Sequence, residues 1–353
     1  MNWALALRLR QRVLLAAAAA GLGAYAAVPA VRRQALRLGV LDMPGARRIH
    51  DRPVPRWGGL AIYLGFLLGT VLAGDPGAPG MTGILAGSAA VVCLGASDDM
   101  HALSPAGKLL GQAAAAAAAM AGGVRITALT VPGGAVTLPG WLSAVLTLLW
   151  LTGMSNAINL MDGLDGLAAG LTLIGCGTML AAAALSPEGS GTAVVVAALA
   201  GACLGFLPWN RHPASIFMGD AGSLLLGFVS AAASAAGLFK SCAAAAFSLP
   251  LLVWALPIAD TVCAFFRRLR RGTSPFRADR EHIHHRLLAA GLSQPEAAAV
   301  LCGMSAVPGF LALAFLCPPE CRPGLAGIAG LTAAGVWRRY RVASRRKNTG
   351  EDG

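Results

Sequence analysis

The hydrophobic residues of this chain are gathered into long runs, which short polar or glycine-rich segments separate. A helix needs about 20 mostly apolar residues to cross a bilayer, and runs of this kind recur along the whole chain. A helix satisfies its backbone hydrogen bonds within lipid, so each run predicts a transmembrane helix. The predicted spans are 13–31, 57–73, 81–97, 107–123, 141–158, 166–186, 191–208, 222–239, 243–266, 296–316 and 323–337.

This pattern predicts an all-α polytopic membrane protein with about ten or eleven transmembrane helices. We expect one integral membrane domain over residues 1–353, with spans within about 13–337 and a basic tail over 338–353. The composition agrees, because only 12% of the residues are charged, against about 25% in a typical soluble domain. The first run is too long for a usual signal-peptide core, so we interpret it as a retained span.

The basic residues predict how the chain is oriented in the membrane. The net charge is +12, and 20 of the 28 Lys and Arg residues lie in the segments 32–56, 267–286 and 338–347. Basic loops favour the cytoplasmic side, which places the N-terminus outside and the C-terminus inside. The charge also suits an anionic substrate or headgroup, and nucleic acid is not expected as a partner. Arg8, Arg10 and Arg12 conflict with this orientation, unless the chain begins with a surface-lying amphipathic segment or a span is miscounted.

The same orientation brings the unusual polar residues to one face of the membrane. The loops that follow the first, third, fifth, seventh and ninth spans are then cytoplasmic, and they carry most of the acids between spans. A transporter usually places polar residues near the midplane. The pattern therefore favours an active site that opens to the cytoplasm, with a non-catalytic lipid-phosphate transporter as the alternative. The outer segment 124–140 could form a small pair of strands.

The most unusual polar stretch is 156–170, between two apolar runs. It contains Asn156, Asn159, Asp162 and Asp165 together with three glycines. Charged residues are costly in a bilayer, so two acids here indicate a functional site rather than a random turn.

Adjacent carboxylates end the third run at Asp98 and Asp99. They repel each other unless a cation or a basic group lies between them, and oxygen ligands suit Mg²⁺. A solvated loop is the alternative. Lys108 and Gln112 follow at helical spacing, and they could turn a cation and an amide toward the same site.

A third acid, Asp220, stands where the eighth run begins. Gly219 and Gly222 would let the backbone approach a ligand, and Ser223 could cap the helix, whose N-terminus favours an anion. Helix capping by Asp220 itself is the simpler reading. Three acid sites on one face nevertheless suggest a site for a metal and a phosphate.

The last basic loop, 267–286, combines arginines with His282, His284 and His285. Arginine clusters bind phosphate through forked donors, so we interpret the histidines as donors to phosphate or sugar oxygens. Zinc is the alternative, which the surrounding positive charge disfavours. Near the N-terminus, the prolines and glycines of 53–59 predict an irregular loop before the second span.

Taken together, these motifs resemble the polyprenyl-phosphate N-acetylhexosamine-1-phosphate transferases of glycosyltransferase family 4, the WecA/TagO/MraY group. The resemblance covers nearly the whole chain. It rests on Pro53-x-Pro55-x-x-Gly58-Gly59, Asp98-Asp99, Asn156-x-x-Asn159-x-x-Asp162-Gly-x-Asp165-Gly, Gly219-Asp220-x-Gly222-Ser223 and His282-Ile-His284-His285-Arg286.

The resemblance implies transfer of a sugar 1-phosphate from a UDP-N-acetyl-sugar to undecaprenyl phosphate, with release of UMP and with Mg²⁺ or Mn²⁺ as cofactor. It implies that Asp220 binds the metal, with Asp98 and Asp99 beside it. The implied catalytic residues are Asp98, Asp99, Asp162, Asp220, His282, His284 and His285. The implied substrate-binding residues are His50, Arg56, Lys108, Asn156, Asn159, Gly163, Leu164, Asp165, Phe217 and Arg268.

Within these roles, residues 159–165 would hold the nucleotide with Phe217 near the uracil, and Arg268 would help the histidines bind the diphosphate and sugar. The histidine motif resembles the WecA/TagO branch, which uses UDP-GlcNAc. An MraY-like phospho-MurNAc-pentapeptide transferase is the alternative. Direct displacement by the lipid phosphate is favoured, with a covalent phospho-enzyme as the open alternative. A lipid phosphate is largely dianionic at neutral pH, so a general base is not strictly required, although Asp98 could orient the phosphate or take a residual proton.

The resemblance also implies a multi-pass protein of the inner, or cytoplasmic, cell membrane that starts a cell-envelope glycan. The sequence does not reveal the oligomeric state, and the resemblance makes a homodimer possible because one is seen in the family. Cys317 and Cys321 lie in a short loop, where either a local disulfide or two free thiols would fit.

Overall fold

A computed structural model describes residues 3–44, 52–131, 134–185, 192–238, 248–272 and 281–349. His50, one of the predicted substrate-binding residues, lies outside these ranges. The helices are α1 (Trp3–Leu38), α2 (Gly58–Ala73), α3 (Met81–His101), α4 (Pro105–Ala121), α5 (Gly140–Met161), α6 (Leu167–Ala184), α7 (Thr192–Asn210), α8 (Gly219–Ala233), α9 (Ser248–Val253), α10 (Ala255–Arg270), α11 (Ile283–Ala289), α12 (Gln294–Leu316) and α13 (Arg322–Thr349). Short pieces are the strands β1 (Leu41–Asp42), β2 (Val54–Pro55), β3 (Ala128–Val131) and β4 (Gly134–Thr137), the π-helix η1 (Ser234–Leu238) and the 3₁₀-helix η2 (Pro319–Cys321).

The predicted fold class, an all-α polytopic membrane protein, is confirmed. Within the described residues, seven helices are long and apolar enough to cross a membrane by length and composition alone. These seven are α1, α3, α5, α6, α7, α12 and the helix formed by α8 with the start of η1, and the shorter apolar helix α2 accompanies them. The total of ten or eleven spans and the orientation in the membrane stay predictions.

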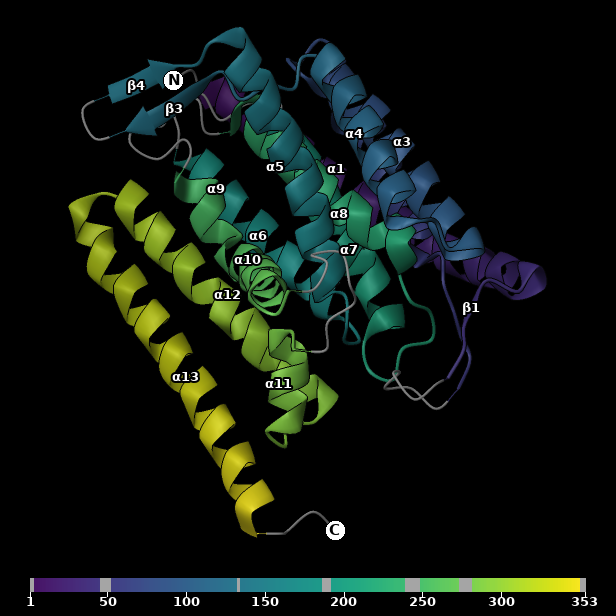
Figure 1. Cartoon of the computed structure of the whole chain (residues 1–353). Helices are drawn as coiled ribbons and strands as arrows, with labels where there is room; N and C mark the ends of the chain where they lie inside the picture. Colours follow the sequence, from purple (N-terminus) through teal and green to yellow (C-terminus); the bar gives the residue numbers. More distant parts are fainter. Residues whose placement is uncertain are drawn as a thin grey trace.

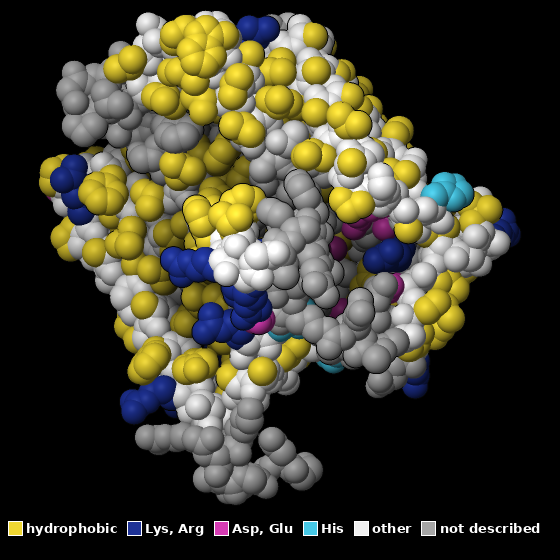
Figure 2. All heavy atoms as spheres, viewed as in Figure 1, with side chains coloured by type: hydrophobic (Ala, Val, Ile, Leu, Met, Phe, Trp, Pro, Cys, Tyr) yellow, Lys and Arg dark blue, Asp and Glu magenta, His cyan; other side chains and the backbone are white. Residues whose placement is uncertain are grey.

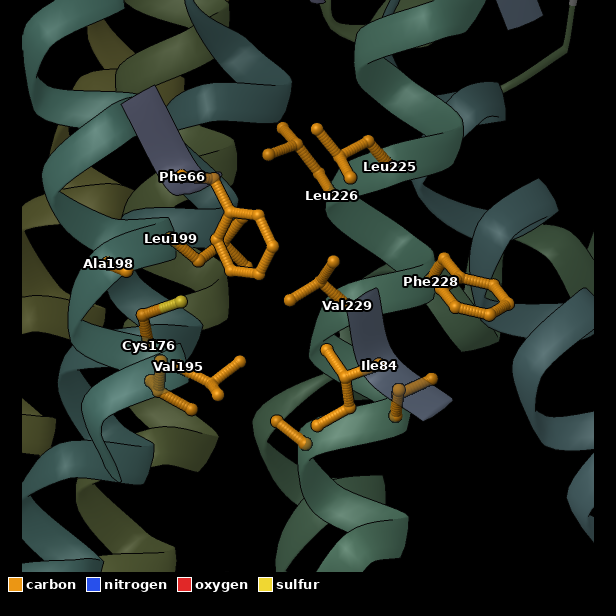
Figure 3. Close-up of a cluster of buried hydrophobic side chains, with 14 of the residues drawn as sticks. Phe66, Ile84, Cys176, Val195, Ala198, Leu199, Leu225, Leu226, Phe228 and Val229 are labelled. Carbon is orange, nitrogen blue, oxygen red and sulfur yellow. The ribbon is translucent and has the colours of Figure 1, made fainter. Parts of the chain in front are cut away.

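Helix α8 lies at the centre of the bundle, packed against α2, α3, α5, α6 and α7 (Figure 1). Its apolar side chains pack into a core shared with α2, α6 and α7, where Phe66, Leu199 and Val229 are fully buried (Figure 3). Glycines allow the closest approach, because a Cβ at Gly59 of α2 would overlap the backbone of Gly222 in α8. The buried position of α8 fixes its polar N-terminus relative to the helices around it.

The N-terminal arginines belong to α1, which is one continuous helix rather than a separate surface segment before the predicted span 13–31. Arg12 donates to the carbonyl of Ala73 at the end of α2, and Arg32 donates to the carbonyl of Ser215. The two arginines are 20 residues apart, a helical rise of about 30 Å, which equals the usual thickness of the hydrocarbon core. They therefore fit the two edges of a membrane.

Two predicted spans near the C-terminus differ in the structure. The span 243–266 is broken at Trp254 into α9 and α10, and its residues 243–247 lie outside the described ranges. The span 323–337 and the basic tail form one helix, because α13 continues to Thr349. Helices α12 and α13 lie side by side at the outer edge of the bundle (Figure 1).

The pair of strands predicted within 124–140 is confirmed. Strands β3 and β4 are antiparallel, with Ala128 opposite Thr137 and Val131 opposite Gly134. At the N-terminal loop, Leu41 and Asp42 of β1 pair with β2. Cys317 and Cys321 are both free thiols, which settles the alternative that the sequence left open.

Candidate active site

The three predicted acid sites meet around the N-terminus of α8. Both oxygens of Asp99, in α3, accept hydrogen bonds from the first amides of α8, from Asp220 at 2.9 Å and from Ala221 at 3.2 Å. The Asp99 side chain is completely buried. Asp99 therefore caps α8 from a neighbouring helix and satisfies amides that otherwise lack a partner.

Lys108 turns toward this site, as its helical spacing suggested, but its ammonium group lies between Asp98 and Asp220 rather than between the adjacent acids. Its Nζ lies 3.0 Å from Oδ2 of Asp98 and also contacts Oδ2 of Asp220. The other oxygen of Asp98 accepts from the amide of Leu103 at 2.6 Å. Both oxygens of Asp98 are thus engaged by groups of the protein itself.

Asn159, in the last turn of α5, connects this helix to Asp220. Its Nδ2 donates to Oδ1 of Asp220 at 2.9 Å and to the hydroxyl of Ser223 at 2.8 Å. Asn156 lies elsewhere: it exchanges hydrogen bonds with the buried Gln112 of α4. In the structure, Asn156 thus joins α5 to α4.

The proline- and glycine-rich loop before α2 is held against the segment that leads into α8. The amides of Gly58 and Gly59 donate to the carbonyls of Phe217 and Met218, at 2.9 and 2.8 Å. Trp57 adopts a positive φ of 82° and donates its indole N–H to the carbonyl of Ala96. These contacts give a physical reason for the motif, because glycine is needed where α2 meets α8.

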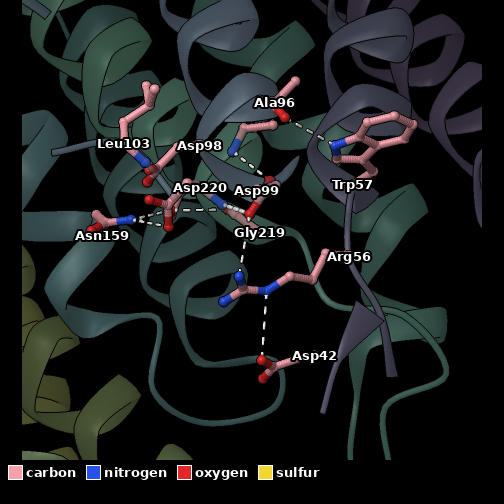
Figure 4. A network of polar contacts seen from close by, with 12 residues as sticks. Asp42, Arg56, Trp57, Ala96, Asp98, Asp99, Leu103, Asn159, Gly219 and Asp220 are labelled. Atoms are coloured by element: carbon pink, nitrogen blue, oxygen red, sulfur yellow. Dashed lines mark hydrogen bonds and ion pairs between the residues drawn. The ribbon is translucent and has the colours of Figure 1, made fainter. Parts of the chain in front are cut away.

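Arg56, from the same loop, lies between Asp42 and Asp99 (Figure 4). Its guanidinium nitrogens are 3.8 Å from a carboxylate oxygen of each acid. At these separations the attraction is mainly electrostatic rather than a short hydrogen bond. Arg56 therefore brings positive charge to the acid cluster.

A cavity of about 280 Å³ opens beside this cluster. In the space-filling view, acidic, basic and histidine side chains gather in a recess, whereas apolar side chains cover much of the surrounding surface (Figure 2). Its lining includes ten of the predicted site residues: Arg56, Asn159, Asp162, Gly163, Leu164, Asp165, Phe217, Asp220, His284 and His285. Arg56 and His285, about 230 residues apart in the sequence, thus line the same cavity.

Other predicted residues do not line this cavity within the described part of the chain. Lys108 contacts the side chain of Asp220, which does line the cavity, and Asp98 in turn binds Lys108. Asp99 accepts from the backbone amide of Asp220, and Asn156 binds Gln112. Arg268 lies in α10, and His282 directly precedes α11; neither is in the lining. Asp165 contributes to the wall, but one of its oxygens accepts from His212 and from the amide of Ala214, so it also holds the loop after α7.

The structure adds residues that the sequence motifs missed. Asp42, Asn210 and Gln294 line the cavity, and Asp260 binds His282. An acid inside a predicted apolar span was an available signal for Asp260, since such residues are costly in lipid. Asn210 and Gln294 stand at helix ends and gave no comparable signal.

The histidine motif meets the polar stretch at Gly163. A Cβ at this position would overlap the ring of His284, so the backbone of Gly163 and the imidazole are in direct contact. Burial, with the charges of His285 and His282, lowers the pKa of His284 to about 4. The ring is therefore neutral at pH 7. Its Nδ1 is buried without a hydrogen-bond partner among the described residues, which makes it a candidate to bind a ligand.

Replacing Gly163 with Ala is expected to lower the turnover of the site about 10- to 100-fold, because the new methyl group displaces His284 and a 1 Å shift is enough for such a loss. Turnover per folded molecule in detergent is the measurement. Gly153→Ala is the matched control, since a Cβ there meets no atom within 4 Å. Equal activity of the two variants would contradict the contact.

Asp162 also lines the cavity, and its carboxylate makes few polar contacts with the protein. None of the described side chains donates a hydrogen bond to its carboxylate. Burial and the nearby charge of Asp220 raise the pKa of Asp162 to about 8, although Arg56 opposes the shift. A cation beside Asp162 would stabilise its ionised form.

The donor set around the cavity fits a hard divalent cation. Among the described residues no preformed group of three or more acidic, histidine or cysteine ligands occurs. Mg²⁺ usually takes only one or two protein carboxylates and completes its shell with water and substrate phosphate. Asp220 and Asp162 both line the cavity, so their carboxylates can face such a cation, although Asn159 and Lys108 also contact the oxygens of Asp220. Asp98 and Asp99 are not in the lining, and their oxygens are engaged by Lys108 and by backbone amides.

A bundle of apolar helices with acids, an arginine and histidines around a polar cavity defines a membrane enzyme that handles anionic substrates. The sequence profile of glycosyl transferase family 4 matches residues 81–238. The chain belongs to this family, in the group of polyprenyl-phosphate N-acetylglucosamine-1-phosphate transferases.

Three relatives illustrate the similarity. A Bacillus subtilis protein named "Probable undecaprenyl-phosphate N-acetylglucosaminyl 1-phosphate transferase" is 41% identical over 270 residues, 75% of this chain and 74% of the relative. A decaprenyl-phosphate N-acetylglucosaminephosphotransferase of Mycobacterium tuberculosis is 40% identical, over 81% of this chain and 78% of the relative. An undecaprenyl-phosphate alpha-N-acetylglucosaminyl 1-phosphate transferase of Escherichia coli K12 is 31% identical, over 75% and 74%.

Proposed function

We propose that this protein transfers N-acetylglucosamine 1-phosphate from UDP-N-acetylglucosamine to undecaprenyl phosphate, with release of UMP. One observation carries the proposal: motifs from Arg56 to His285 form a single polar cavity in a chain about 40% identical to transferases named for this reaction. We place the reaction at the cytoplasmic face of the inner membrane, as the first step of a cell-envelope glycan. A transporter would instead be expected to carry its polar residues through the midplane.

The residues of the cavity suit the two substrates. Phe217 can stack on the uracil ring, and the turn 163–165 with Asn159 can bind the nucleotide. His284 is neutral, and with His285 it can donate to or accept from the diphosphate and sugar oxygens. Arg56 and Lys108 supply positive charge beside the position where the two phosphates must approach each other.

We propose that Mg²⁺, which Mn²⁺ can replace, acts at this site. Asp220 and Asp162 would hold it, and Asp98 and Asp99 would act by fixing Lys108 and the start of α8. When bound, the cation neutralises charge on the transferred phosphate. The lipid phosphate is largely dianionic at neutral pH, so Asp98 is not needed as a general base.

The test is release of UMP from radiolabelled UDP-N-acetylglucosamine, with purified protein, undecaprenyl phosphate and Mg²⁺. We expect transfer to the lipid to require all three, to stop on addition of EDTA, and to return with excess Mg²⁺ or Mn²⁺. Transfer that continues in EDTA would refute the proposed requirement for a divalent metal. Transfer only from UDP-MurNAc-pentapeptide would favour the MraY-like alternative, and lipid transport without UMP release would favour a transporter.

A further inference from the structure

Asp260 of α10 and His282, at the start of α11, form a buried pair outside the cavity. Nδ1 of His282 lies 2.7 Å from Oδ2 of Asp260, and the two side chains are 5% and 7% exposed. A carboxylate at Nδ1 requires the proton on that nitrogen, so the imidazole donates and its tautomer is fixed. Such a pair is costly to bury unless its remaining atoms are also satisfied.

The second oxygen of Asp260 meets that requirement. Oδ1 accepts a hydrogen bond of 3.0 Å from the amide of Ile283, the first residue of α11. His282 precedes the helix and makes no side-chain cap of its own. One carboxylate therefore holds both the ring before α11 and the first amide of α11, although α10 and α11 are separated in the sequence.

From this pair the contacts lead to the cavity. The rings of His282 and His284 are stacked, with centroids 5.9 Å apart and planes within 3° of parallel. His284 and His285 are in contact at 4.2 Å between centroids, and both line the cavity. A rotation of His282 would therefore move the ring that faces Gly163.

We propose that Asp260 is a positioning residue that holds His282 and the start of α11, so that His284 and His285 face the cavity. His282 then acts through its neighbours rather than by touching substrate, which revises the catalytic role that the motif suggested. The inference deepens the proposed function and rests on it.

The same joint offers a matched control. Glu281, next to His282, also binds α10: its carboxylate pairs with Arg271 at 2.6 Å and with Arg267 at 3.4 Å. The side chains of Glu281 and Arg271 are 45% and 56% exposed, and exposed ion pairs contribute little. Glu281→Gln should thus change turnover by less than about twofold. Disrupting the buried pair of Asp260 and His282 should lower turnover far more.

The experiment compares Asp260→Asn, His282→Gln, the double variant and Glu281→Gln in the full-length protein. Asparagine keeps the size and one acceptor but turns an amide toward His282, which forces the other tautomer. We expect kcat/KM for the UDP-sugar, per folded molecule, to fall about 10- to 100-fold in Asp260→Asn, with KM for the lipid unchanged. In the double variant, kcat/KM for the UDP-sugar should be less than about twofold below that of His282→Gln alone.

Hydrogen exchange supplies a readout that does not need activity. Amides of α11 should exchange faster in Asp260→Ala than in Glu281→Gln. Wild-type kcat/KM in Asp260→Asn, or independent losses that multiply in the double variant, would overturn the positioning role. A wild-type protein that releases no UMP would refute the proposed function instead, and exchange in α11 would still decide whether Asp260 holds this helix.

Discussion

Replacing Asp220 with Asn is expected to reduce transfer by about 10³-fold or more. The Asp220 carboxylate accepts from Asn159, contacts Lys108 and lines the cavity. An asparagine there has one oxygen for these two donors, so its NH2 group would face the other donor. It would also remove the charge that we propose binds the metal. The measurement is the initial rate of UMP release per folded molecule, with the unfolding temperature recorded in parallel.

Glu320→Gln is the control for Asp220→Asn, because Glu320 is an exposed acid in the short helix before α13. It should keep wild-type turnover. Raising Mg²⁺ tests the metal further: a variant that retained only weak metal binding would recover part of its rate at high Mg²⁺. Near-normal turnover of Asp220→Asn would contradict both the metal assignment and the central place of Asp220 in the site.

Replacing Asp99 with Asn is expected to lower both stability and transfer. The two oxygens of Asp99 accept from the amides of Asp220 and Ala221, and an asparagine has only one acceptor for them. One buried amide would lose its partner, at a cost of about 1–3 kcal/mol. The start of α8 would shift, and we expect transfer to fall at least about 100-fold.

The pattern of the two variants separates their roles. Asp99→Asn should lower the unfolding temperature in detergent clearly more than Asp220→Asn does, since the Asp99 side chain is completely buried and caps α8. A normal unfolding temperature with lost activity in Asp99→Asn would indicate that this acid acts directly on metal or substrate. That result would restore the metal-binding role that the motif suggested.

Much of the site could be predicted from residue types alone. Asp162 and Asp220 stood out because acids beside apolar runs have no inexpensive structural role in lipid. His284 stood out because it lies in an arginine-rich loop that suits phosphate. Ten predicted residues do line one cavity. Which of these residues line the cavity and which hold its surroundings in place could not be predicted. These roles depend on hydrogen bonds between helices far apart in the sequence.

The acids show this most clearly. Asp98 and Asp99 read in the sequence as a metal pair, yet the structure commits their oxygens to Lys108, Leu103 and the amides of α8. Asp162, read as a nucleotide-binding acid, lines the cavity and receives no hydrogen bond from a described side chain. Asp260 was missed altogether, because its partner His282 lies 22 residues away.

The sequence by itself determined the membrane-spanning helices, the family motifs and the kinds of groups in the site. Hydrophobic run length and the cost of buried charge act locally, so both can be read along the chain. Only the tertiary structure decided which carboxylates line the cavity, where the glycines let α2 and α8 meet, and that Gly163 contacts His284. These features arise from helix packing, which brings together atoms that the sequence keeps more than 120 residues apart.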